Sequence, residues 1–180
     1  VFGQVDKQIL DEDYQKKSDT IYGVTKHLSE IIVREEVNSE KKFIIRLPVV
    51  LGYSAHRAWI PEAVRKLQRN EIIQIFNSEN KYNSLTTDFQ LTKFAWHLLV
   101  YGGNYNSIDV NIGSSQAIKI IEIVKLLRNE LKSNSEILNT DSDLGTYLIN
   151  NNKAENIGYT PPSVIDSVHY YVNSLKNNKI

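Results

Sequence analysis

Helical and strand-like patterns alternate along this chain, and this alternation limits its possible folds more than any other feature. Apolar residues recur at helical spacing from about Ile21 to Val37. A short apolar run from Lys42 to Leu47 follows and ends at Pro48, which is typical of a buried strand. Helices that alternate with strands favour an α/β fold with at least part of a parallel sheet.

The rest of the chain continues this alternation. The further predicted elements, in order, are a helix at 59–70, a strand at 71–76, a helix at 88–101, a strand at 108–112, and helices at about 114–132 and 163–175. Asp88, Ser114 or Ser115, and Ser163 are the expected N-caps, because their side-chain oxygens can accept from free helix N–H groups. We expect the first 18 residues to form a loop. The convincing strands are few for a free-standing doubly wound sheet.

The composition argues against several classes of protein. Lys plus Arg (21) balances Asp plus Glu (21), so no net field would draw the chain to nucleic acid or to an anionic membrane. The chain has no Cys, and its four His are not spaced as metal ligands, so we expect no metal site. No stretch approaches the roughly 20 apolar residues that span a bilayer, and no leader-like segment is present. We therefore expect a cytoplasmic protein with no membrane partner.

Tyr22 and Lys26 form the first candidate for chemistry. They are four residues apart on the first predicted helix and are therefore neighbours on its surface. By helical geometry they lie with Ser29 and Val33, roughly opposite the apolar residues of the same helix. We call those apolar residues the apolar stripe: Ile21, Val24, Leu28, Ile31 and Ile32. We expect the stripe to contact the core, and Tyr22 and Lys26 to face solvent or a cleft.

Such a pair suits acid/base catalysis. A phenol has an ordinary pKa of about 10, so its use as a base near pH 7 requires a much lower pKa. A neighbouring ammonium group and an oxidised nicotinamide both favour the phenolate. The phenolate could take a proton from a sugar hydroxyl while hydride leaves the same carbon for NAD(P)⁺. About one Tyr-x-x-x-Lys is expected by chance in a chain with ten Tyr. The residues around the pair must therefore show whether it has a catalytic role.

Those surrounding residues resemble one family in several places. The run from Tyr22 to Glu30 resembles the active-site helix of the extended short-chain dehydrogenase/reductases, the NAD-dependent epimerase/dehydratase family: Tyr-Gly-x-Ser/Thr-Lys, then Glu four residues later. Four other blocks are similar to this family and follow its order: Val1-Phe2-Gly3, Arg46 to Gly52, Asn111 to Ser114, and Lys153 to Pro161. Together the blocks span nearly the whole chain, so they carry more weight than the Tyr/Lys pair alone.

The resemblance implies a particular architecture. It implies the carboxyl-terminal part of a Rossmann-type parallel sheet together with the small α/β substrate-binding domain. Residues 1–52 would complete the dinucleotide-binding domain, and 53–180 would be mainly the substrate-binding domain, with 104–116 returning to the sheet. None of the eight Gly forms the Gly-x-x-Gly-x-x-Gly turn that seats a pyrophosphate. We therefore expect the nucleotide-binding half to lie outside this chain, which alone would have little NAD affinity and no turnover.

The resemblance also implies roles for individual residues. Tyr22 would be the acid/base, and Lys26 would lower its pKa and bind the nicotinamide ribose. Pro48 and Val49 would lie against the nicotinamide of NAD or NADP. The candidates for substrate binding are His56, Arg57, Lys81 and Asn83, in or beside the segments 53–59 and 81–88.

Lys81 departs from the family pattern. Many relatives carry an Arg at this position, seven residues before the Asp that corresponds to Asp88. A Lys can still meet a substrate phosphate as a point charge, although a solvated loop residue is the alternative.

Several alternatives remain open at this stage. The family reading implies an epimerase, dehydratase or reductase of nucleotide sugars in polysaccharide biosynthesis, without distinguishing the three or the sugar. It also implies a homodimer that pairs through the Tyr22 helix, with the apolar stripe wide enough to serve both core and partner. A non-catalytic binding or scaffolding protein on the same fold is the second reading, and a structural module without activity is the third.

Overall fold

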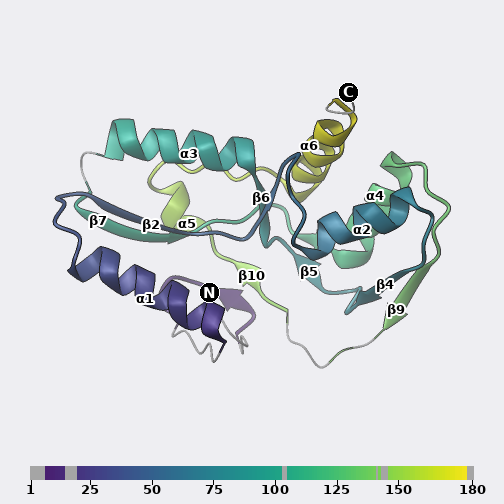
Figure 1. Cartoon of the computed structure of the whole chain (residues 1–180), viewed down its shortest axis with the longest axis horizontal. Coiled ribbons are helices and arrows are strands. Elements are labelled where there is room, and N and C mark those ends of the chain that lie inside the picture. Colours follow the sequence, from purple (N-terminus) through teal and green to yellow (C-terminus); the bar gives the residue numbers. More distant parts are fainter. Residues whose placement is uncertain (1–6, 15–19, 103–104, 141, 143–145, 178–180) are drawn as a thin grey trace.

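Parallel strand pairs and covering helices make up the computed structural model of this chain, which describes residues 7–14, 20–102, 105–140, 142 and 146–177. The strand β2 (Lys42–Arg46) pairs in parallel with β7 (Ser107–Asn111), in a register that joins Arg46 to Asn111. Figure 1 shows α1 (Ile21–Glu35) and α3 (Asp88–Tyr101) on opposite sides of this pair. The predicted α/β class is therefore confirmed.

The other strand pairs are shorter. Three of them are parallel: β1 (Ile9–Leu10) with β10 (Leu148–Ile149), β3 (Val49–Leu51) with β6 (Leu85–Thr87), and β4 (Ile73–Phe76) with β9 (Ile137–Thr140). One pair is antiparallel, β5 (Lys81–Tyr82) with β8 (Ile118–Lys119). The remaining helices are α2 (Trp59–Gln68), α4 (Ile120–Glu130), α5 (Asn152–Glu155) and α6 (Val164–Asn177).

Two apolar clusters form the core. The larger cluster joins α2, α4 and α6 to the short strands around them, and its fully buried members include Leu51, Ile60, Leu67, Leu85, Ile123, Val124, Leu127, Val168 and Val172. The smaller cluster lies between α3, β7 and the segment that carries α5, and it contains Phe94, Leu98, Val110, Ile112, Ala154, Ile157 and Tyr159. Helices and strands thus bury their apolar faces against each other, as α/β layers require.

Most predicted elements lie where the sequence placed them, but two of the expected caps were wrong. The N-cap of α3 is Thr87, whose hydroxyl accepts from the Gln90 N–H at 3.1 Å, while Asp88 is already the first helical residue. The helix α4 begins at Ile120 after Lys119, not after Ser114 or Ser115. The buried Ser114 hydroxyl instead donates to the Leu85 carbonyl, and β8 forms before the helix starts.

Other differences concern short strands. Within the segment expected to be a loop, residues 7–14 include β1, which pairs with β10. Strands of two or three residues such as β1 and β3 carry too little periodicity to be recognised locally, so pairing with a distant segment defines them. The family-like block Val1-Phe2-Gly3 lies outside the described residues.

The apolar stripe of α1 is the main correction to the predicted packing. Its five side chains are 40–85% exposed, and the only buried residues of α1 are Gly23 and Glu30. The opposite face of the helix is turned toward β2: Glu30 is buried there, and Tyr22 and Lys26 line a cavity between the helix and the strand. Helical periodicity shows where an apolar face lies, but not which surface will cover it.

Candidate active site

Tyr22 and Lys26 line a cavity of about 340 Å³ between α1 and β2. Ser29, Glu30 and Val33 complete the helix side of the cavity, and residues 43–47 form the strand side. The Lys26 ammonium lies 5.7 Å from the centre of the Tyr22 ring, as their i,i+4 spacing requires. Tyr22 is 65% exposed, so its ring borders the open mouth of the cavity. The pair therefore faces a cleft against the sheet, where an incoming ligand could reach both side chains.

The start of α1 is fixed by a side-chain cap. The Thr20 hydroxyl accepts a hydrogen bond from the Gly23 N–H at 3.1 Å, which satisfies one of the free N–H groups of the first turn. Because Tyr22 lies within this turn, the cap restrains its backbone.

Pro48 and Val49 line a second cavity, of about 360 Å³, that adjoins the first. Arg46 and Leu47 border both cavities, so the predicted cofactor residues lie on two sides of one strand end. Tyr82, Ser84, Asn111 and Tyr147 are among the other residues that line the second cavity. It is located at the carboxyl ends of β2 and β7, the edge where open α/β sheets bind their ligands.

Tyr82 is a second phenol at this site, but it is unsuited to act as a base. Burial raises the pKa of Tyr82 to about 12. Its hydroxyl donates to the Ser84 carbonyl at 2.8 Å, so the proton already has an acceptor. A phenol of this kind stays protonated near neutral pH, whereas Tyr22 in the first cavity lies beside an ammonium group.

A third cavity, also of about 360 Å³, shares Tyr82 and Thr146 with the second. Most of its lining is apolar and includes Trp59, Ile73, Ile75, Phe76 and Ile120. Trp59 and Tyr82 meet edge to face, with ring centres 5.3 Å apart. The three cavities therefore follow one another from Tyr22 to an aromatic pocket near α2, each sharing lining residues with the next.

The remaining predicted substrate residues lie in two kinds of environment. His56, Arg57 and Lys81 are exposed and do not line the first or the second cavity. Asn83 is buried, and its amide donates to the carbonyls of Ser114 and Ile149 at 3.1 and 2.9 Å and accepts from the Ile149 N–H at 2.8 Å. These bonds give the Asn83 side chain a structural function between β6 and β10.

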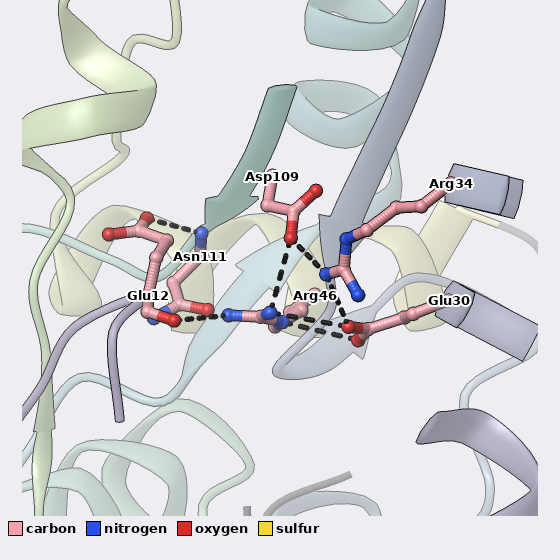
Figure 2. Close-up of polar contacts among 6 residues, drawn as sticks. All are labelled: Glu12, Glu30, Arg34, Arg46, Asp109 and Asn111. Atoms are coloured by element: carbon pink, nitrogen blue, oxygen red, sulfur yellow. Dashed lines mark hydrogen bonds and ion pairs between the residues drawn. The ribbon is translucent and has the colours of Figure 1, made fainter. Parts of the chain in front are cut away.

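A network of charged groups, with Glu30 and Arg46 buried, lies between α1 and the strands β2 and β7 (Figure 2). The Arg46 guanidinium contacts both oxygens of the Glu30 carboxylate, at 3.1 and 3.2 Å, and lies 3.4 Å from an Asp109 oxygen. Arg34 bridges Glu30, at 3.0 Å, and Asp109. The hydrogen bond to Asp109 raises the pKa of Arg34 further above its ordinary value. The network therefore connects α1, β2 and β7.

Glu12 extends this network toward the second cavity. Arg46 donates to the backbone carbonyl of Glu12 at 3.1 Å, and the Glu12 carboxylate accepts from the Asn111 N–H at 2.7 Å (Figure 2). Sequence reasoning missed the network as a unit. The available signal was that Glu30 and Arg46 both belong to the family-like blocks, although nothing in the sequence shows that they meet.

Comparison with known proteins identifies the fold. No family model matches the sequence, and no curated protein matches it either. Solved structures do match, among them a UDP-N-acetylglucosamine 4-epimerase from Methanobrevibacter ruminantium in complex with UDP-N-acetylmuramic acid, with a TM-score of 0.78 and 15% identity over 97% of this chain. A UDP-glucuronic acid 4-epimerase from Bacillus cereus in complex with NAD matches with a TM-score of 0.76 and 16% identity over 96%. A dTDP-4-dehydrorhamnose reductase from Yersinia enterocolitica matches with a TM-score of 0.74 and 16% identity over 97%.

The chain has the fold of the NAD-dependent sugar-nucleotide epimerases and reductases. It corresponds to the carboxyl-terminal portion of that Rossmann-type fold and spans 59%, 57% and 63% of the three structures named above. The predicted fold class is thus confirmed for the described residues. In this fold the carboxyl edge of β2 and β7, with the second cavity and the two cavities that adjoin it, is the region to examine for function.

Two further findings concern the described ranges alone. No helix among them has the length and apolar character needed to cross a membrane. Likewise, no group of three or more His, Asp or Glu side chains in those ranges is arranged to hold a metal ion.

Proposed function

We propose that this chain is the carboxyl-terminal portion of an NAD(P)-dependent epimerase, dehydratase or reductase of nucleotide sugars, with Tyr22 as its acid/base. One observation carries the proposal: Tyr22 and Lys26 share a cavity with Leu47, directly beside the cavity of Pro48 and Val49. The likeness to a 4-epimerase in complex with NAD and to a dTDP-4-dehydrorhamnose reductase supports the same class of chemistry.

The residues of the two adjoining cavities fit a nicotinamide nucleotide. Leu47, Pro48 and Val49 offer an apolar wall to a flat ring, and Lys26 offers an ammonium group to ribose hydroxyls. Tyr22 and Lys26 would hold the ribose, and Pro48 and Val49 would lie against the ring. When bound, the nicotinamide would accept or return the hydride of the sugar carbon.

Tyr22 would move the proton that accompanies this chemistry. As a base it would take the proton of a sugar hydroxyl, and as an acid it would return it. The Lys26 ammonium, one helical turn away and 5.7 Å from the centre of the Tyr22 ring, would lie near the negative charge that develops in the first of these steps. Tyr82 is excluded from the same role, because its pKa is raised to about 12.

The third cavity suits the nucleotide part of the substrate. Its apolar lining with Trp59, Phe76 and Tyr82 can accept a flat heterocycle, and Lys66 on its border can meet a negative charge. Lys81 would contact the diphosphate as a point charge. Complexes of similar structures with UDP-glucuronic acid and with UDP-glucose support a nucleotide sugar as the ligand class.

The exposed apolar stripe of α1 supports a homodimer. Five large apolar side chains on one helix face are more than isolated surface residues, and such patches mark interaction sites. A second copy that presents the same stripe would bury both, as two-fold symmetry allows.

A substitution of Tyr22 tests the proposal. In the natural polypeptide that carries this chain, Tyr22→Phe should lower kcat for NAD-dependent conversion of nucleotide sugars by about 10³-fold, since a positioned acid/base contributes about 10²–10⁴-fold. Tyr101→Phe, at an exposed Tyr that lies on α3, is the matched control and should leave kcat unchanged. Unchanged turnover in Tyr22→Phe would mean that Tyr22 is not the acid/base, whereas no turnover in the wild-type polypeptide would favour a non-catalytic use of the fold.

The 180 residues alone should behave differently. Because they lack the glycine-rich turn, calorimetric titration with NAD⁺ should detect no binding in the micromolar range, and no nucleotide sugar should be converted. Micromolar affinity for NAD⁺ would contradict this part of the proposal.

A further inference from the structure

We propose that Glu30 is a positioning residue, which sets the orientation of α1 over the sheet through Arg46 and thereby places Tyr22 and Lys26 at the edge of the nicotinamide cavity. This inference rests on the proposed function, because it concerns how the Tyr/Lys pair is held for catalysis. It assigns a role to the charged cluster that borders the proposed cofactor site.

The attachment of α1 to the sheet is polar, which is unusual for a helix that covers a sheet. Its apolar stripe points away from the sheet, and Glu30 is the only residue of α1 with a side chain beyond Cα that is buried. An apolar contact tolerates sliding and rotation because it is not directional. A helix that does not attach through its apolar face needs another kind of contact to fix its orientation. The ion pairs lie between α1 and the sheet, where such contacts are needed.

The Glu30–Arg46 contact has the geometry to orient a helix. Two nearly equal contacts, at 3.1 and 3.2 Å, join the Glu30 carboxylate to the planar Arg46 guanidinium. Such bidentate pairs fix direction as well as distance. Both residues are only 7% exposed, so water does not compete for these groups.

Arg46 is itself fixed in the sheet. It is the last residue of β2 and pairs in register with Asn111 on β7 (Figure 2). Its guanidinium also contacts Asp109 on β7 and the Glu12 carbonyl. A rigid strand end therefore presents Arg46 to the helix, and Arg34 adds a second link from α1 to Asp109.

The same strand end borders the active-site cavities. Arg46 and Leu47 line both the Tyr22 cavity and the Pro48 cavity, while Glu30 lies one helical turn beyond Lys26. A rotation or shift of α1 about the Glu30–Arg46 contact would therefore move Tyr22 and Lys26 relative to Pro48. A misplacement of about 1 Å in an active site can cost about 100-fold in rate.

Three variants separate positioning from stability. Glu30→Gln keeps the shape of the side chain but removes its charge. The double variant Glu30→Leu/Arg46→Met replaces the buried pair by apolar side chains, an exchange that is often neutral for stability but removes the directional contact. Glu35→Gln, at an exposed carboxylate on the same helix, is the matched control.

Two measurements are made on each variant. The first is kcat and KM of the natural polypeptide with NAD⁺ and with UDP-glucuronic acid and UDP-glucose as probes. The second is the nuclear Overhauser contact between the Tyr22 ring and the Leu47 methyl groups in the 180-residue chain, two residues that line one cavity. We expect kcat to fall about 100-fold in Glu30→Gln and in the folded double variant, with KM within about threefold of wild type. We expect the Tyr22–Leu47 contact to weaken in both, and Glu35→Gln to match wild type.

The two measurements fail independently. If the folded double variant keeps kcat within threefold of wild type, Glu30 is not a positioning residue even though the enzyme assignment stands. If the wild-type polypeptide converts no nucleotide sugar, the proposed function fails. The inference about Glu30 is then tested by the Tyr22–Leu47 contact alone. A contact that persists in both Glu30 variants would then overturn the inference, and its selective loss would support it.

Discussion

Asn83 and Ile149 are joined by two hydrogen bonds like those between paired strands, but Asn83 uses its side-chain amide and Ile149 its backbone. The Asn83 side chain accepts from the Ile149 N–H at 2.8 Å and donates to the Ile149 carbonyl at 2.9 Å. A buried amide thus satisfies both polar groups of a distant backbone position, which a buried peptide group requires. Asn83, a candidate for substrate binding, thus also holds β10 in place.

Asn83→Ala should destabilise the fold. It removes three hydrogen bonds from a buried site and leaves the Ile149 groups without partners, which should lower the free energy of unfolding by about 2–4 kcal/mol. Urea denaturation measures this loss, and Asn80→Ala at a nearby exposed residue serves as control. Unchanged stability together with weaker nucleotide-sugar binding would instead support substrate binding by Asn83.

Arg46→Met should be strongly destabilising. It leaves the Glu30 carboxylate buried without its main partner, and breaking a buried ion pair from one side costs about 3–5 kcal/mol. Arg65→Met removes an exposed partner of Glu62 and should cost about 1 kcal/mol or less. Chemical denaturation of both variants checks the difference. Equal midpoints for the two would mean that the network contributes no more than a surface pair.

The stability of the fold should decline in strong alkali. Burial raises the pKa of Tyr82 and of Tyr159 to about 12, whereas an unfolded Tyr titrates at about 10. Since the unfolded chain loses these protons first, the contribution of each phenol is complete below pH 10 and is lost as pH rises through about 12. The loss should reach roughly 1–3 kcal/mol for each. Denaturation curves at pH 9 to 12 measure it.

Single variants test which phenols are responsible. Tyr82→Phe should flatten the alkaline decline, because it removes one of the two phenols whose raised pKa causes that decline. Tyr101→Phe, an exposed residue, should leave the slope as in wild type. A slope that is identical in all three proteins would assign the alkaline loss to other groups.

Leu28→Glu should break the proposed dimer. It places a charge in the middle of the apolar stripe, and a charge buried without a partner in an interface is costly. Sedimentation should give a dimer for wild type and a monomer for Leu28→Glu. Leu99→Glu, at an exposed apolar residue of α3, should remain dimeric. A clean monomer for wild type at high concentration would count against the interface.

The sequence alone determined the local parts of this protein. Periodicity located α1, β2 and β7, because each is defined by contacts within a few residues or by a short apolar run. The adjacency of Tyr22 and Lys26 likewise follows from helix geometry, so it needed no knowledge of the rest of the chain. The order of the family-like blocks indicated the fold, which the similar structures bear out.

Only the tertiary structure decided how these parts meet. The spacing of residues on α1 could not show that its charged face would pack on the sheet and its apolar stripe would stay exposed. That outcome depends on Glu30 reaching Arg46, on Arg46 reaching Asp109, and on the strand register that brings Arg46 beside Asn111. Buried ion pairs and amides such as Asn83 are satisfied by partners distant in sequence, and a local pattern carries no information about them.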